Sequence, residues 1–328
     1  MVKKIYFDTT DYYVLPEKYH LDHEYCIYLH DQLVRIIVEG ERLGVFKQSI
    51  KTKKKVPELK DEFFFDWLRK TFPRQSKKFM VRNIFAGTLS DALHFILTAL
   101  QCSVKGKLSV TYAILRKPLK DNLFILELLN VDKRDFFKRF KNPSELLEIG
   151  SRFPPEKKKE IINKNCQKIK FLANFNDIIY DSRYNKSAKG FESLFEKANH
   201  ITTNVKHFKT GQENLNFVFS NNESKDSQWK SLYRILPFLL RYFVDTAYYI
   251  LNSNITKKLK DDLNLVDILY YKRHYPQIIK MMSFNLSCTK CGKSVKATKN
   301  ILDICEKTRI YTCPCGDQEP ITNVELTK

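Results

Sequence analysis

The cysteines near the carboxyl end of the chain have the types and spacing of metal ligands. One pair is Cys288-x-x-Cys291-Gly292, and after residues 292–312 a second pair follows as Cys313-x-Cys315-Gly316. Thiolates bind Zn²⁺ well when each of two tight turns supplies two of them, because four sulfurs then surround the metal as a tetrahedron. A glycine after each pair suits such a turn, since glycine adopts a positive φ without strain. The spacing predicts a zinc site made by Cys288, Cys291, Cys313 and Cys315.

The fourth ligand of this site has two candidates in the sequence. Only Pro314 separates the second pair, which is shorter than the usual two-residue spacing, so Cys305 is an alternative to Cys315. A redox-active dithiol and chance clustering are the other interpretations of the cysteines. Residues 294–298 and 308–312 alternate polar and apolar side chains, as two strands of a hairpin would. Over residues 284–320 the tail resembles a zinc ribbon, and a closed four-sulfur site leaves no open position for catalysis.

The chain carries a large positive charge, which favours polyanionic partners. Its 57 Lys and Arg residues outnumber its 37 Asp and Glu residues, for a formal net charge of +20 over 328 residues. Basic residues concentrate at 51–82, 133–141 and 157–170, and aromatic residues lie among the first two groups. Cations neutralise phosphates and aromatic rings stack on bases, so the mixture predicts nucleic-acid binding; a solvated lysine surface over a phenylalanine core is the alternative. The predicted nucleic-acid ligands are Lys53, Lys54, Lys55, Arg69, Lys70, Arg74, Lys77, Lys78, Arg134, Lys138 and Arg139.

The pattern of apolar residues predicts a mainly α-helical protein in three parts. Residues 1–82 are expected to form a small basic α+β segment, with a strand over 3–11 and either strands or a helix over 25–38. Residues 83–282 are expected to form a helical bundle, and residues 283–328 the zinc ribbon. The expected helices cover 89–100, 108–129 with an interruption at Pro118, 156–180, 187–205, 229–251 and 259–282. Charged residues and Pro237 within 229–251 argue against a membrane-crossing helix there, and none is expected elsewhere.

Three groups of charged residues each share one face of a predicted helix. The groups are Arg116, Lys120 and Glu127; Arg234, Arg241 and Asp245; and Glu192, Glu196 and His200. Charges on apolar helices need partners, so one interpretation is a set of interhelical ion pairs in which the first two groups face each other. The other is a polar cleft in which arginine orients phosphate and His200 moves protons with a glutamate. The catalytic candidates under that second interpretation are Arg116, Glu127, Glu196, His200, Arg241 and Asp245.

Residues 106–127 resemble a helix of the HEPN-like and abortive-infection bundle proteins. In that group a glycine opens a helix that has an Ala-x-x-Leu-Arg core and then a glutamate, and here Gly106, Ala113-Ile-Leu-Arg116 and Glu127 stand in those places. The resemblance covers at most residues 84–255 and implies a helical bundle of bacterial defence or toxin type. Many members are ribonucleases with an Arg-x4–6-His signature. None of the seven histidines of this chain lies five to seven residues after an arginine, which argues against that type of catalysis.

Together these features predict a cytoplasmic, nucleic-acid-binding zinc-ribbon protein with RNA as the expected ligand. Ribonuclease activity stays open within this prediction. The cytoplasmic assignment follows from the thiolate site, which suits a reducing compartment, and from an amino-terminal apolar stretch too short for a signal peptide. One alternative is a non-enzymatic adaptor whose ribbon docks a protein partner. Another is a membrane-surface protein whose basic face meets anionic lipid.

Overall fold

A computed structural model describes most of the chain. The described residues are 14–47, 49–52, 61–140, 153–169, 175–186, 190–202, 204, 209–212, 216, 222–255, 265–274, 285–321 and 324–327. The predicted strand over 3–11 and three of the predicted nucleic-acid ligands, Lys53, Lys54 and Lys55, lie outside these residues.

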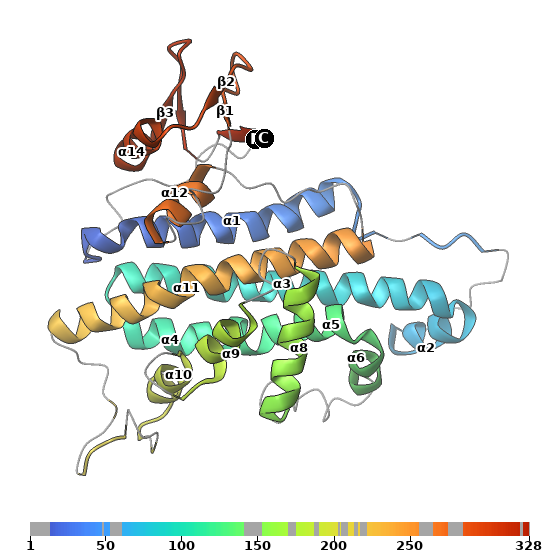
Figure 1. Cartoon of the computed structure of the whole chain (residues 1–328). Coiled ribbons are helices and arrows are strands. Elements are labelled where there is room, and N and C mark those ends of the chain that lie inside the picture. The colour runs from blue at the N-terminus through green and yellow to red at the C-terminus, as the bar shows by residue number, and fades with distance from the viewer. Residues whose placement is uncertain are drawn as a thin grey trace.

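Long helices lie side by side and form the body of the protein (Figure 1). Helix α1 (His20–Arg42) packs against both α3 (Pro73–Val104) and α11 (Asn222–Ile250). The shorter helices are α2 (Asp61–Thr71), α4 (Leu108–Arg116), α5 (Leu123–Val131), α6 (Lys133–Phe140), α8 (Pro155–Lys168), α9 (Asn176–Tyr184), α10 (Glu192–Asn199) and α12 (Leu265–His274). The predicted mainly α-helical bundle is therefore confirmed.

The apolar stripes of these helices meet in one core. Leu29 and Leu33 of α1, Leu89 and Ile96 of α3, and the middle of α11 are buried there together. Of the two possibilities for residues 25–38, the helix is the one that forms, and it places the described part of the amino-terminal segment against the bundle.

The predicted helix over 108–129 forms as one continuous run with a change of pitch at its proline. A π-helical turn, Lys117–Asn122, joins α4 to α5. Pro118 has no backbone N–H to donate to the preceding turn, and a single π turn accommodates that loss without ending the helix. Pro237 likewise lies inside α11, which together with the π-helical turn Leu251–Ile255 after it covers the predicted 229–251 helix.

Two predicted helices are shorter than expected, and a third lies partly outside the described residues. The 156–180 helix breaks after Lys168, because Ile169 leaves the helical region at φ −92° and ψ 83°, and α9 begins only at Asn176. The 187–205 helix is reduced to α10, which ends where His200 adopts an extended conformation. Of the 259–282 helix, the structure describes α12. No glycine or proline marks the ends at Lys168 and Asn199, so the apolar pattern alone does not predict them.

The carboxyl-terminal unit combines two small sheets with one helix. Strands β1 (Asn285–Ser287), β2 (Ser294–Lys296) and β5 (Glu325–Thr327) form one antiparallel sheet, and β3 (Ile310–Thr312) pairs with β4 (Gln318–Pro320) in the other. The predicted hairpin between 294–298 and 308–312 is wrong, because helix α14 (Lys299–Thr308) separates those strands and each pairs elsewhere. The Thr298 hydroxyl caps α14 by accepting from the N–H of Ile301, which is a helix-start signal that alternation does not reveal.

Ion pairs attach this unit to the bundle beside α1 and α12 (Figure 1). Lys272 of α12 contacts both Asp303, at 2.7 Å, and Glu306 of α14. Arg309, which follows α14, lies with its Nε 2.9 Å from a carboxylate oxygen of Glu24 on α1. The unit is therefore held at two places along α14.

Helix α3 has the length and apolar composition of a helix that could cross a membrane, and it is the one such helix among the residues searched. In the bundle it packs on α1, α4 and α5 through Leu89, Ile96 and Leu100. The core helix of a folded domain meets the same two criteria.

Candidate functional site: a four-cysteine centre and a basic cavity

Four cysteines converge at the ends of the two small sheets. The Sγ atoms of Cys288, Cys291, Cys313 and Cys315 all lie within 4.8 Å of one another. Cys288 and Cys315 are 4.0 Å apart and Cys291 and Cys313 are 3.7 Å apart. A tetrahedral metal with metal–sulfur bonds of about 2.3 Å requires sulfurs about 3.8 Å apart. The four thiols therefore fit a metal site, and they are the four residues that the spacing predicts.

Two tight turns bring the thiols together. After β1, the N–H of Gly292 donates to the carbonyl of Cys288 at 2.9 Å, and after β3 the N–H of Gly316 donates to that of Cys313 at 2.8 Å. Both glycines have a left-handed backbone, with φ of 70° and 89°. The second turn closes in this way although one residue, rather than two, separates its cysteines. The shorter spacing of Cys313 and Cys315 therefore still allows both of their sulfurs to join the four-sulfur group.

Cys305 is not part of this group. It lies on α14 and is buried in the hydrophobic core. Burial raises the pKa of its thiol to about 11. Cys315 rather than Cys305 therefore completes the four-sulfur group.

Carboxylates support the first turn from the second sheet. Buried Glu319 of β4 accepts hydrogen bonds from both the backbone N–H and the hydroxyl of Thr289, each at 2.9 Å. Lys290 Nζ lies 3.0 Å from a carboxylate oxygen of Asp317. The turn that holds Cys288 and Cys291 is thus fixed to the strand that follows the other two ligands.

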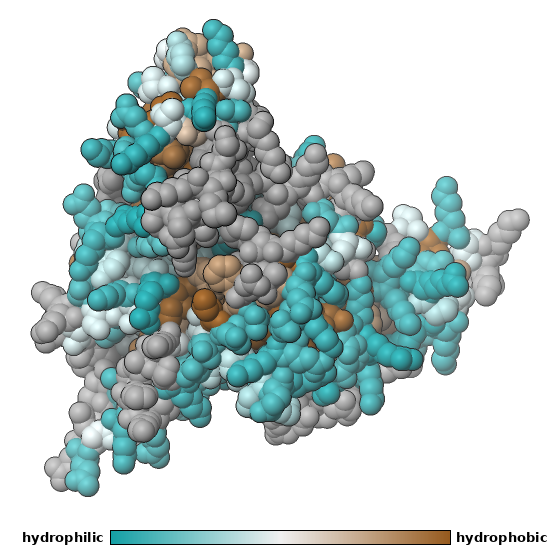
Figure 2. All heavy atoms as spheres, in the orientation of Figure 1, coloured by the Kyte–Doolittle hydropathy of each residue, from teal (hydrophilic) through white to brown (hydrophobic). Residues whose placement is uncertain are grey.

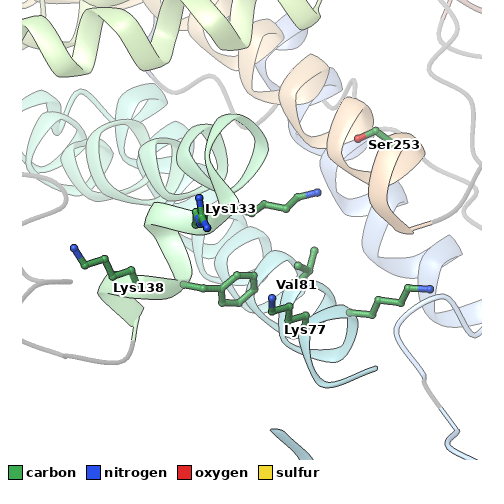
Figure 3. Close-up of a pocket in the computed structure, with 8 residues that line it drawn as sticks. Lys77, Val81, Lys133, Lys138 and Ser253 are labelled. Carbon is green, nitrogen blue, oxygen red and sulfur yellow. The ribbon is translucent and has the colours of Figure 1, made fainter. Parts of the chain in front are cut away.

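A cavity of about 730 Å³ lies between α3 and α6 and is lined mainly by cations. Figure 3 shows Lys77 and Val81 on α3, with Lys133 and Lys138 of α6 across from them. The described residues that line it are Lys77, Lys78, Val81, Lys133, Arg134, Phe137, Lys138 and Ser253. Five of these eight residues are cations and none is acidic.

The cavity unites part of two basic stretches that are far apart in the sequence. Lys77, Lys78, Arg134 and Lys138 are predicted nucleic-acid ligands, and Lys133 joins them. Among the described side chains, none of those four predicted ligands has a carboxylate within ion-pair distance. The pKa of Lys133 is lowered by burial and by the charge of Lys168. Among the described residues, Lys77, Lys78, Arg134 and Lys138 therefore give this region a concentration of positive charge.

The other predicted nucleic-acid ligands lie outside the cavity. Arg139 forms an ion pair with Asp135 at 3.0 Å and lies over the ring of Phe153 at 4.5 Å, so its charge already has partners within the protein. Arg69 lies 3.5 Å from Asp66 on α2, and Lys70 and Arg74 are exposed nearby. Exposed Phe64 and Phe65 accompany them on α2.

The third basic stretch belongs largely to α8. Lys157 and Lys164 both pair with Glu160 there. Hydrophilic side chains cover α8 densely on the face shown in Figure 2. This stretch therefore matches the alternative of a solvated surface more closely than the cavity does.

The predicted pairing of the two charged rows on 108–129 and 229–251 is wrong. Glu127 pairs with Arg183 of α9 at 2.6 Å, and neither side chain is exposed to solvent. The hydroxyl of Tyr242 donates to the same carboxylate at 2.6 Å. Arg241, one position earlier on α11, points to a different neighbour. Glu127 of α5 therefore takes its counter-charge from α9, although α5 also packs against α11.

Arg241 belongs to a separate buried network around α12. It pairs with Asp245 on its own helix and lies 3.3 Å from Asp267. Asp267 also accepts hydrogen bonds from Tyr25 and Tyr28 of α1. These charges join three helices, which is the ion-pair interpretation rather than the cleft.

The remaining catalytic candidates are distributed over the surface of the bundle. Arg116 is partly exposed and lies 3.9 Å from Asp121. Half-buried Glu196 and exposed His200 form a pair at 3.4 Å at the end of α10. Lys120 and Glu192 form a buried pair that joins the π-helical turn to α10. Among the described residues, the six candidates do not gather at one place.

Comparison of the chain with protein-family models, with curated protein sequences and with solved structures finds no match in any of the three. The resemblance to HEPN-like bundle proteins therefore stays a prediction.

Proposed function

We propose that this protein binds nucleic acid through the basic cavity and carries a structural Zn²⁺ at its four cysteines. The observation that supports the first half is the set of residues described in the cavity wall, in which five cations from two helices surround one space and no acid is present. Each cation that neutralises a phosphate releases a condensed counterion, which favours binding at low salt. RNA is the ligand that the family resemblance implies, so it is the first probe, with DNA of the same sequence beside it.

Binding rather than cleavage is the activity that these side chains support. Glu127, Arg241 and Asp245 are buried in ion pairs that join helices. Glu196 lies on α10 and His200 directly follows it. Helix α10 packs against α4 and α9, whereas the cavity belongs to α3 and α6. No described residue proposed for acid–base chemistry lines the cavity.

The experiment measures binding of a fluorescent single-stranded RNA by anisotropy as salt rises from about 50 to about 200 mM. For single strands the slope of log affinity against log salt is about −0.7 for each phosphate contact, so five contacts give a slope of about −3.5. In the variant K77Q/K78Q/K138Q, two remaining contacts predict a slope of about −1.4.

A matched control removes the same charge elsewhere. Lys105, Lys107 and Lys230 are exposed and do not line the cavity. Lys105 lies 28 residues beyond Lys77 at the far end of the same helix, which is about 40 Å away. K105Q/K107Q/K230Q should keep the wild-type slope. Equal slopes for the two triple variants, or no binding at low salt by the unaltered protein, would show the proposal to be wrong.

Zinc is the metal that we propose for the four cysteines. Tetrahedral sites with four sulfur ligands hold Zn²⁺ or iron, and a closed zinc site stabilises small units such as this one, which has only three-residue strands. Elemental analysis of the purified protein should give one zinc per chain. Stoichiometric iron with visible absorbance, or no bound metal, would reject this assignment.

A further inference from the structure

We infer that the basic cavity receives an unpaired nucleotide, so that the protein binds single-stranded in preference to duplex nucleic acid. This inference rests on the proposed function and narrows its ligand. The inference is based on the apolar residues that line the cavity, because cations alone would bind the phosphates of a duplex equally well.

The two helices present matching sets of side chains to the space. On α3, Lys77 and Lys78 are followed one turn later by Val81. On α6, Lys133 and Arg134 are followed one turn later by Phe137 and Lys138. Residues at these spacings share a helix face. Each helix therefore offers adjacent cations and then an apolar surface to the same cavity.

Phe137 is held so that part of its ring stays available to a ligand. Its neighbour Phe136 is buried in the core, and the two rings meet edge to face with centroids 5.5 Å apart. Phe137 itself is only half-buried, and it lines the cavity. A ring fixed in this way offers a surface on which a base stacks, while cations on either side contact the phosphates.

The size of the cavity agrees with an extruded nucleotide. Its volume of about 730 Å³ lies within the range of about 300–1,000 Å³ that is typical of ligand clefts. A duplex keeps its bases stacked on one another, so it reaches the cations through its phosphates and leaves Phe137 without a partner. Base stacking on an aromatic side chain changes affinity by about 5- to 150-fold for each base. That difference is the preference that we expect for single strands.

The test uses one RNA of mixed sequence, single-stranded and annealed to its complement, in the anisotropy assay at fixed low salt. The full-length protein should bind the single strand at least about fivefold more tightly than the duplex. Phe137→Leu keeps apolar volume but removes the ring, and it should abolish this preference by weakening single-strand binding. Phe137→Tyr retains the ring and should keep the preference.

Phe140→Leu is the matched control, because Phe140 is an exposed aromatic residue on the same helix that does not line the cavity. It should leave both affinities unchanged. Adenosine monophosphate is added as a competitor, and we expect it to displace the RNA only at concentrations far above the RNA dissociation constant.

The outcomes separate this inference from the proposal beneath it. The inference is overturned if single strand and duplex bind with equal affinity and Phe137→Leu has no effect. In that case the proposed function still stands, provided that binding depends on salt. Mononucleotide binding as tight as RNA binding also overturns it, since the ligand would then be a free nucleotide. Failure to bind either RNA at low salt overturns both.

Discussion

Replacing Glu127 by leucine leaves the guanidinium of Arg183 without its counter-charge inside the bundle. The two side chains are 2.6 Å apart and have no solvent exposure. Burial opposes the charge on Arg183, yet the neighbouring carboxylate keeps its pKa raised above the usual value. Breaking a buried pair by removing one partner costs about 3–5 kcal/mol, so E127L and R183M should each lower the free energy of unfolding by that amount. Removing both charges together should cost about 2–3 kcal/mol less than the sum.

Urea unfolding followed by circular dichroism measures this double-mutant cycle. The control is the exposed pair Arg42 and Glu39, whose atoms are also 2.6 Å apart but whose side chains are 67% and 29% exposed. Its cycle should give a coupling energy below about 1 kcal/mol, because water screens the charges. The reasoning is refuted if the buried single variants lower the free energy of unfolding no more than the exposed ones do. It is also refuted if the effects of the two buried substitutions are additive.

Three further predictions concern the metal and the acid stability of the fold. Cys313→Ser should abolish stoichiometric zinc by elemental analysis, whereas Cys305→Ser should retain it; loss of metal from both would place Cys305 among the ligands. Glu319→Gln should weaken metal affinity about 10- to 100-fold in chelator competition, because Glu319 fixes the turn of Cys288 through Thr289; unchanged affinity would contradict this. Burial, with a smaller contribution from His20, lowers the pKa of His23 to about 3, so the unfolded chain takes up a proton below pH 6.5 that the folded protein does not. The contribution of His23 to the free energy of unfolding is then fully present above pH 6.5 and falls towards pH 3, with about 2 kcal/mol lost by pH 5. Between pH 7.5 and 5, H23Q should therefore lose about 2 kcal/mol less than the unaltered protein. An equal loss in both proteins would show that His23 is not the group responsible.

The parts that the sequence predicts well are those set by neighbouring residues. The cysteine pairs and their glycines form two local turns, so their spacing predicts the four-sulfur group. The apolar repeats over 108–129 and 229–251 are long enough to identify helices even across Pro118 and Pro237. In both cases the information lies within a few turns of chain.

The partners of charged residues could not be predicted in this way. Helical spacing places Glu127 and Arg116 on one face, but it does not say which helix lies opposite. Arg183, the partner of Glu127, lies on a nine-residue helix that begins within the predicted 156–180 helix and continues past its expected end. Its burial follows from how α9 packs, and no local pattern marks it. Helix α14 was missed for a related reason, since the alternation around it is also compatible with strands.

The cavity differs from the rest of the protein in how its charge is balanced. Inside the bundle, Arg183, Arg241 and Lys120 each meet a carboxylate, as burial requires. At the cavity, cations from two helices are brought together and repel one another, which disfavours the folded state. A surface shaped only by solubility would disperse such residues or alternate them with acids, as Glu160 does between Lys157 and Lys164. The phosphate-bearing ligand that we propose would neutralise these like charges and remove the repulsion when it binds.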